Sequence, residues 1–251
     1  MTHAELGDGA WLIWAFAFAA FVLGGFVKGA LGVGLPLVVV PLLTLMLSPY
    51  RAIGMVVVPV IFSNAWQVWE AGVSRKEVRR FSPLIVMLVI TTLLTVGFTL
   101  SLSERDVARM LAAAVLVAVA LMAWQPELRV SPRREGWVGA GVGALSGLLG
   151  GVSSLTGPLI ISYLMALRLP REVFVGAISV IYLCAAIPLY GMMLLNHPIG
   201  PAEILISAAA LVPVWAGLRI GRWCRQRMSE AAFRRMLLGF LALIAVALLL
   251  K

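Results

Sequence analysis

The stretch GGFVKGALGVGLPLVVVPLL, Gly24 to Leu43, interrupts a membrane-length apolar segment with glycines and restarts it at a proline. A second stretch, SGLLGGVSSLTGPLIISYL from Ser146 to Leu164, has the same order of glycines, Gly-Pro and a new apolar segment. Irregular backbone inside a bilayer is tolerated only where protein or a water-filled cavity satisfies its polar groups. Two such breaks in corresponding positions of the two halves predict a transporter with a substrate site between them.

The composition is that of a membrane protein with many spans. Of the 251 residues, 62% are hydrophobic and 12% are charged, whereas about a quarter of the residues of a soluble domain are charged. The net charge of +9 does not indicate nucleic-acid binding, because the basic residues stand in short clusters between apolar segments, as the positive-inside rule expects. No loop is long enough to hold a soluble catalytic domain.

The apolar segments predict an all-α polytopic membrane protein. They lie at about 10–28, 33–48, 52–72, 81–101, 107–124, 136–150, 156–168, 172–195, 201–219 and 232–250. A full span needs roughly 20 residues, so the short segments within 10–48 and 136–168 make each of these regions a broken helical hairpin. Whether each hairpin crosses the bilayer or re-enters it stays open at this point.

Three basic clusters set the predicted orientation in the cell (inner) membrane. They are Arg75 to Arg80, Arg129 to Arg134, and Arg219 to Arg235, and all three fit the cytoplasmic side. The first hairpin then begins and ends outside and the second begins and ends inside. The acidic N-terminus and Lys251 are both expected to be external.

The two halves therefore read as repeats of opposite orientation. Aligning LGVGLPLVVVPLL with SSLTGPLIISYLM places Pro36 on Pro158, and each half is then one hairpin followed by three spans. Such inverted repeats are typical of secondary transporters. We expect a first repeat at 1–125, a cytoplasmic linker at 126–135 and a second repeat at 136–251, joined in one membrane domain.

The two breaks are also candidate anion sites. Pro36 and Pro158 suit the first turn of a new helix, and Ser153, Ser154 and Thr156 are residues that favour helix N-caps. Free N–H groups and the dipole at a helix N-terminus attract an anion. The other interpretation is that the glycines only allow close helix packing.

Lys28 lies between the two arms of the first hairpin. An ionisable group inside the membrane is a functional candidate, here as the partner of an anionic substrate. Alternatively, Lys28 ends a full first span and extends its ammonium to the membrane surface.

Polar residues inside later spans extend the candidate site. Asn64 and Gln67 stand in an otherwise apolar segment, and Ser179 and Tyr182 stand in its counterpart in the second half. They either line the same cavity or form hydrogen bonds between helices. The predicted substrate-binding residues are Lys28, Gly29, Gly32, Val33, Gly34, Leu35, Pro36, Asn64, Gln67, Ser153, Ser154, Thr156, Gly157, Pro158, Ser179 and Tyr182.

Residues for enzyme chemistry are not placed where they would be needed. No Asp or Glu lies deep in an apolar segment, and His3 and His197 are terminal or in a loop. We therefore predict no catalytic residues, no metal site, no cofactor and no enzymatic activity. A proton relay through carboxylates is not expected either.

At these motifs the chain resembles the TauE/SafE family of sulfite and organosulfonate permeases. The resemblance extends from about Phe21 to Leu250 and is carried by GALGVGLPLVVVPLL, by SGLLGGVSSLTGPLIISYL and by the following LPREVFVGAISVIY. Val33 and Leu35 interrupt what is often a run of glycines in the family, and Ser153 to Thr156 replace glycines in the second half. The resemblance implies transport of small sulfur oxyanions or organosulfonates.

The sequence thus predicts an exporter of small sulfur-containing anions that works by alternating access. The expected partners are the anionic substrate and the lipid bilayer, without nucleic acid, and a homodimer is left open. The alternative is a non-transporting membrane subunit that docks a partner through its basic cytoplasmic loops.

Overall fold

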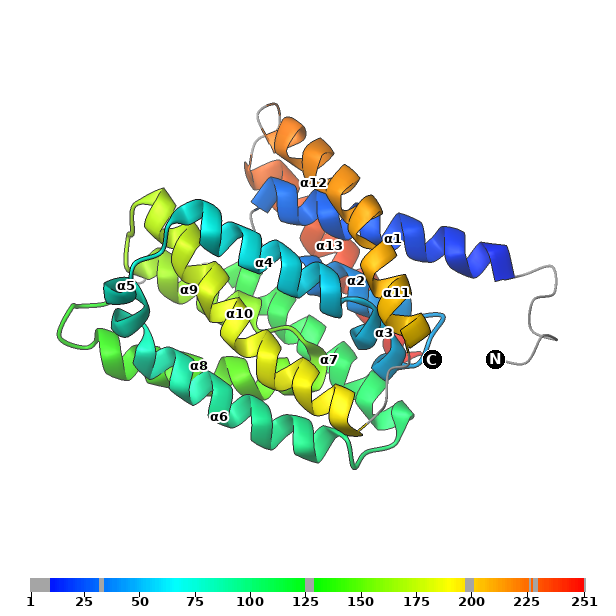
Figure 1. The fold of residues 1–251 in the computed structure, drawn as a ribbon, viewed down its shortest axis with the longest axis horizontal. Helices are drawn as coiled ribbons and strands as arrows, with labels where there is room; N and C mark the ends of the chain where they lie inside the picture. Colours follow the sequence, from blue (N-terminus) through cyan, green and yellow to red (C-terminus); the bar gives the residue numbers. More distant parts are fainter. Residues whose placement is uncertain are drawn as a thin grey trace.

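A computed structural model describes residues 10–31, 34–124, 129–196, 201–225, 227 and 230–250. Within these ranges the regular elements are all helices (Figure 1). They are α1 (Ala10–Leu31), α2 (Leu35–Thr44), α3 (Pro49–Met55), α4 (Val57–Ala71), α5 (Arg75–Arg80), α6 (Ser82–Thr99), α7 (Glu104–Trp124), α8 (Glu135–Ser153), α9 (Gly157–Ala166), α10 (Arg171–Asn196), α11 (Pro201–Ala209), α12 (Leu211–Arg225) and α13 (Glu230–Leu249). The first nine residues and Lys251, whose side of the membrane was predicted, lie outside the described residues.

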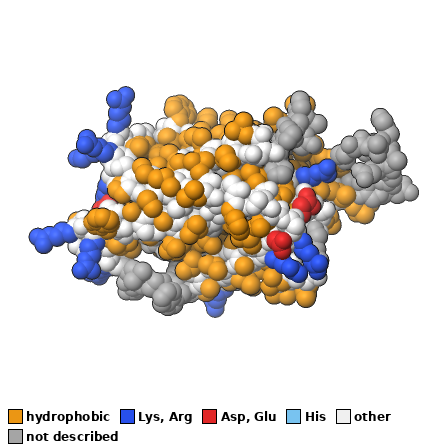
Figure 2. Space-filling model, turned by 90° about the horizontal axis from the view of Figure 1, so that it is seen from below, with side chains coloured by type: hydrophobic (Ala, Val, Ile, Leu, Met, Phe, Trp, Pro, Cys, Tyr) orange, Lys and Arg blue, Asp and Glu red, His pale blue; other side chains and the backbone are white. Residues whose placement is uncertain are grey.

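The surface fits a lipid environment. In the described part, six helical stretches are long and apolar enough to cross a membrane. Large apolar side chains cover the middle of the molecule, and most of the visible charged residues gather at its two ends (Figure 2). Soluble monomers rarely expose apolar surface on this scale. The predicted all-α polytopic membrane fold is confirmed.

Each predicted hairpin pairs one long helix with one short helix. The long helices α1 and α8 have 22 and 19 residues, and the short helices α2 and α9 have 10 residues each. At 1.5 Å per residue, a 10-residue helix extends about 15 Å, which is about half of the hydrocarbon core of a bilayer. The backbone breaks therefore lie inside the molecule, where α2 and α9 begin.

The hairpins open toward opposite ends of the molecule. At one end, Arg80 at the end of α5 forms an ion pair with Glu135 at the start of α8, and the Val130 N–H donates to the Ala166 carbonyl at the end of α9. At the other end, the Tyr50 hydroxyl at the start of α3 donates to the Thr99 carbonyl at the end of α6. The helix α2 leads into α3 at this second end, where α1 also begins (Figure 1).

The short helix α5 is fixed by local hydrogen bonds rather than by burial. Ser74 and Glu77 form a reciprocal capping box at its N-terminus. Hydrogen bonds from the Ser74 backbone and hydroxyl hold the pKa of Glu77 below its usual value. This cap turns the chain sharply between α4 and α6 at the basic end of the molecule.

The main helix contacts pair elements of one half with elements of the other. The long hairpin arm α8 packs on α6, and the other long arm, α1, packs on α12. Likewise α4 packs on α10 and α7 on α13. Exchanging the two halves turns the α6–α8 contact into the α1–α12 contact and leaves the α4–α10 and α7–α13 contacts in place. The predicted substrate site therefore lies at the interface between the halves.

Glycines set the distance between the most closely packed helices. On α8, Gly139, Gly143, Gly147 and Gly151 follow one another at every fourth residue. The last three face α6, and Gly139 lies between Tyr163 of α9 and Leu84 of α6. A Cβ atom added at Gly143 would overlap the Leu84 carbonyl oxygen. Small residues at this spacing let two helix backbones approach each other within a membrane, so part of the glycine pattern serves packing.

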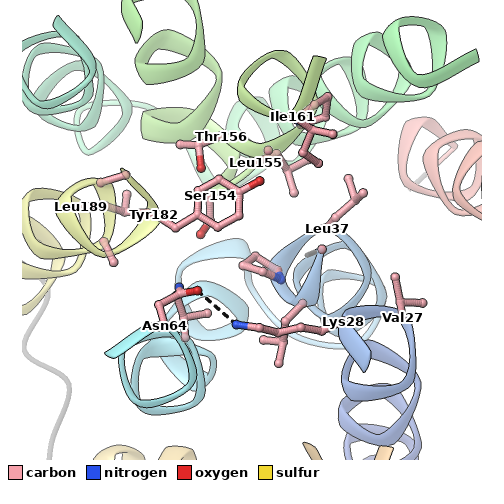
Figure 3. Close-up of a pocket in the computed structure, with 18 of the residues that line it drawn as sticks. Val27, Lys28, Leu37, Asn64, Ser154, Leu155, Thr156, Ile161, Tyr182 and Leu189 are labelled. Atoms are coloured by element: carbon pink, nitrogen blue, oxygen red, sulfur yellow. Dashed lines mark hydrogen bonds between the residues drawn. The ribbon is translucent and has the colours of Figure 1, made fainter. Parts of the chain in front are cut away.

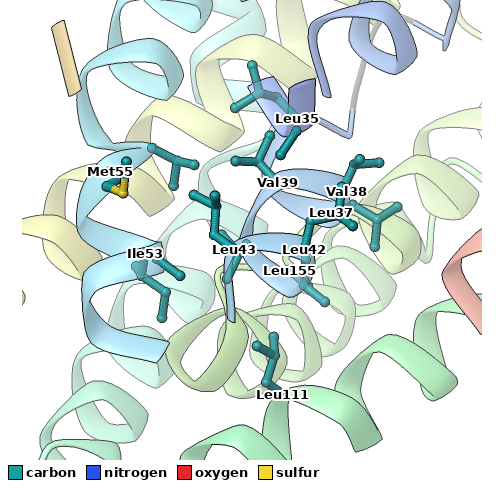
Figure 4. Packing of buried hydrophobic residues seen from close by; sticks show 14 of the residues in the cluster. Leu35, Leu37, Val38, Val39, Leu42, Leu43, Ile53, Met55, Leu111 and Leu155 are labelled. Atoms are coloured by element: carbon teal, nitrogen blue, oxygen red, sulfur yellow. The ribbon is translucent and has the colours of Figure 1, made fainter. Parts of the chain in front are cut away.

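The half-helix α2 is at the centre of the apolar core. Of its ten residues, all except Pro36 are buried. Its leucines and valines pack against Ile53 and Met55 of α3, Leu111 of α7 and Leu155 between α8 and α9 (Figure 4). A helix that is apolar on all faces is stable only when it is buried. This packing shields α2 and holds its N-terminus in place.

Candidate functional site

A cavity of about 60 Å³ lies where the two half-helices begin (Figure 3). One buried water needs only about 10–15 Å³ of such a cavity. The cavity therefore accommodates several waters or one small oxyanion. Its described lining is Val27, Lys28, Gly34, Leu35, Pro36, Leu37, Val60, Asn64, Ser154, Leu155, Thr156, Gly157, Pro158, Ile161, Tyr182, Ala185, Ala186, Leu189 and Tyr190. These residues come from both halves of the chain.

Lys28 extends from α1 into this cavity and does not reach the surface. It is only 5% exposed, and its ammonium donates to the Ser63 hydroxyl at 2.6 Å and to the Asn64 side-chain oxygen at 3.1 Å. Both acceptors lie on α4 and both are neutral. The interpretation that Lys28 extends to the membrane surface therefore does not fit the structure.

The starts of α2 and α9 are built alike and both line the cavity. Each helix has a proline at its second position, Pro36 or Pro158, and neither N-cap residue makes a side-chain hydrogen bond to its helix. The N-cap of α2 is Gly34 with a φ of 105°, a conformation that glycine adopts without strain. The N-terminal dipoles of two helices thus point at one cavity, which favours a negatively charged ligand.

Hydroxyl groups face the cavity from the second half. Ser154 ends α8 in the left-handed conformation, with a φ of 62°, and its hydroxyl is hydrogen-bonded to the Tyr190 hydroxyl at 3.2 Å. The Tyr182 hydroxyl is buried and has no hydrogen-bond partner among the described residues. It lies 2.8 Å from the point where a Cβ atom of Gly157 would be. A buried unpaired hydroxyl beside the start of α9 is a donor ready for a ligand.

The structure brings ten of the sixteen predicted site residues together. These are Lys28, Gly34, Leu35, Pro36, Asn64, Ser154, Thr156, Gly157, Pro158 and Tyr182. Figure 3 shows Lys28 and Asn64 on one side of the cavity and Ser154 and Thr156 on the other. Gly32 and Val33 lie outside the described residues.

The remaining four predicted residues have other contacts. Gly29 packs against the Leu218 backbone of α12, and the Ser153 hydroxyl donates to the Leu149 carbonyl at 2.6 Å. The Ser179 hydroxyl donates to the Gln67 side-chain oxygen at 3.2 Å, which joins α10 to α4. For these two helices the structure shows the interhelical hydrogen bond that was the alternative prediction.

The sequence patterns did not indicate Tyr190 or the apolar wall formed by Ala185, Ala186 and Leu189. All four lie on α10, the helix of Tyr182. Residues three, four, seven and eight positions further along a helix share its face, and these four stand at those spacings from Tyr182. A helical projection of residues 171–196 around Tyr182 would have found them.

Comparison with known proteins identifies the family. The family model described as "Sulfite exporter TauE/SafE" matches residues 17–248, nearly the whole chain. No significant match was found among curated proteins or among solved structures. The chain belongs to the TauE/SafE sulfite exporter family and is a multi-pass membrane transporter of this exporter type.

Proposed function

We propose that the chain exports a small sulfur-containing oxyanion, such as sulfite or an organosulfonate, across the cell membrane. The observation that carries this proposal is Lys28, a buried ammonium in a cavity whose described lining contains no acidic side chain. Burying a charge without a countercharge is strongly unfavourable. An anion in the cavity would offset the free-energy cost of burying the Lys28 charge. Sulfite, the substrate in the family name, is such an anion.

The substrate oxygens would meet donors from both sides of the cavity. On the first side these are the Lys28 ammonium and the backbone N–H groups at the start of α2. On the second side they are the start of α9 and the hydroxyls of Ser154, Thr156 and Tyr182. Because the donors belong to both halves, the bound anion would link the halves together.

This arrangement suits transport by alternating access. We propose that residues 1–125 and 136–251 are inverted repeats that rock against each other around the substrate. Two features support the proposal: the hairpins open toward opposite ends, and the contacts of α1 with α12 and of α6 with α8 exchange when the halves are exchanged.

Export can proceed without a coupling ion. A monoanion that leaves a cell with a negative interior gains about 2.3 kcal/mol per 100 mV. No carboxylate lines the described cavity to relay a proton. In proteoliposomes, the potential at which the current reverses should follow the anion gradient and be independent of pH and sodium. A reversal potential that shifts with pH would show proton coupling instead.

Binding of anions to the purified protein tests the proposal directly. A ligand that binds only the folded state raises the apparent stability. The panel is sulfite, thiosulfate, sulfoacetate and taurine, and we expect at least one of them to raise the unfolding temperature, while carboxylate analogues have smaller effects. Lys28→Met and Thr156→Val should remove this increase.

The matched control is Ser179→Ala, which removes a hydroxyl on α10 outside the cavity lining. This variant should keep the anion response of the unchanged protein. If no anion stabilises the protein, the proposal is wrong. A non-transporting membrane subunit would then be the better description.

A further inference from the structure

The described lining of the cavity contains a single cationic side chain. Within its described lining, Lys28 is the one charged side chain, and the remaining polar side chains are neutral. These are Asn64, Ser154, Thr156, Tyr182 and Tyr190. Two ion pairs among the described residues, Arg80 with Glu135 and Arg109 with Asp106, lie outside this lining.

The hydrogen bonds of Lys28 orient its charge without neutralising it. Two of its three ammonium N–H bonds are directed to Ser63 and Asn64, which leaves one for a ligand. The Ser63 hydroxyl in turn donates to the Val60 carbonyl at 3.3 Å. The acceptor side of this network therefore ends at neutral groups, and the positive charge stays available.

The helix starts add donors, but fewer than two ordinary helix N-termini would. Pro36 and Pro158 occupy the second helical position of α2 and α9, so each start lacks one of the N–H groups that usually meet an anion. The rest of the lining is largely apolar, including Val27, Leu155 and Ile161. Such walls do not solvate a second negative charge.

We infer that the site selects monoanions, a conclusion that rests on the proposed function. One ammonium and one monoanion give a neutral occupied cavity. A dianion leaves one negative charge without a countercharge among apolar walls and neutral donors. The substrate class is then sulfonates and the hydrogensulfite form of sulfite, while sulfate and the sulfite dianion are excluded.

Methanesulfonate and sulfate form a matched test pair, because both are tetrahedral at sulfur and differ mainly in charge. Isothermal titration calorimetry is the suitable measurement, since sulfate raises protein stability non-specifically in unfolding experiments. We expect methanesulfonate to bind at least about tenfold more tightly than sulfate, equivalent to about 1.4 kcal/mol. Lys28→Met should remove most of this preference, and Ser179→Ala should keep it.

A pH series on the unchanged protein gives a second readout that does not depend on a variant folding. Above the pKa of hydrogensulfite, the ratio of the apparent affinity for total sulfite to that for methanesulfonate should fall about tenfold per pH unit. Among the described residues, the titratable groups that face the cavity are Lys28 on α1 and Tyr182 and Tyr190 on α10. Their own titration would change the binding of both ligands, so the difference between the ligands reports the charge of the anion.

The outcomes separate the inference from the proposed function. Sulfate binding as tightly as methanesulfonate, or sulfite binding that does not weaken as the dianion forms, would overturn monoanion selection and leave anion export standing. Absence of binding by every anion would overturn both.

Discussion

Ser154 combines an unfavourable backbone conformation with a hydroxyl in the cavity. Its φ of 62° lies in the left-handed region, which costs a non-glycine residue about 1–2 kcal/mol. Its hydroxyl meets that of Tyr190 beside the start of α9. Strained residues of this kind cluster at functional sites, so the conformation of Ser154 supports the proposed role of its hydroxyl.

Two substitutions separate the backbone strain of Ser154 from the role of its hydroxyl. Ser154→Ala removes the hydroxyl and keeps the strain, whereas Ser154→Gly removes both. We expect the glycine variant to be about 1 kcal/mol more stable than the alanine variant in thermal or denaturant unfolding. Anion affinity should fall to the same extent in both. Equal stability of the two variants would show that Ser154 stores no strain.

At the scale of elements, α6 and α8 pack closely because a row of glycines on α8 has no side chains to separate the two helices. Gly143→Ala would drive a Cβ atom into the Leu84 carbonyl, so the helices must separate, at a cost of about 1–3 kcal/mol. At Gly141, on the same helix, a Cβ atom would have no neighbouring heavy atom within 4 Å. Gly141→Ala should therefore be neutral or stabilising by up to about 1 kcal/mol, and similar losses in both variants would contradict the packing argument.

The break between α3 and α4 is completed by a residue from the other half. Pro59 has no N–H to give to the Met55 carbonyl, and this carbonyl instead accepts from the buried Ser207 hydroxyl at 2.9 Å. The same hydroxyl accepts from the Val58 N–H at 3.1 Å. Ser207→Ala leaves two buried backbone groups unpaired and should destabilise the protein by about 2 kcal/mol.

The control for Ser207 is Ser101→Ala, which removes an exposed hydroxyl that donates to the Phe98 carbonyl. A surface change of this kind should stay within about 0.5 kcal/mol in the same unfolding measurement. If Ser207→Ala is equally mild, water or a shifted backbone satisfies Met55 and Val58.

The sequence predicts features that depend on neighbouring residues, and it does not predict contacts that depend on how distant helices pack. The starts of α2 and α9 were predicted because Pro36 and Pro158 act on their own backbone. The pairing of Lys28 with Asn64 was not predicted, since it joins positions 36 residues apart through packing. Gly29 was assigned to the site and packs on α12 instead, because α1 is apolar on nearly all faces and its sequence does not show which face meets which neighbour.

At the scale of the whole molecule, the charge at the two ends predicts the orientation in the membrane. The end with α5 and the start of α8 carries the clusters Arg75 to Arg80 and Arg129 to Arg134. The end with the α6–α7 connection carries Glu104 and Asp106 beside its arginines. We predict from the positive-inside rule that the first end lies in the cytoplasm, so that the first hairpin opens to the outside and the second to the cytoplasm.

Accessibility of single cysteines tests this orientation. In a background with Cys184→Ala and Cys224→Ser, we expect Arg105→Cys, at the exposed start of α7, to react with a membrane-impermeant maleimide in intact cells. Arg133→Cys, exposed before α8, should react only after the cells are permeabilised. The opposite pattern would invert the molecule and, with it, the side from which each half-helix receives the anion. Reaction of both cysteines in intact cells would mean that the protein inserts in two orientations, which the charge difference between the ends opposes.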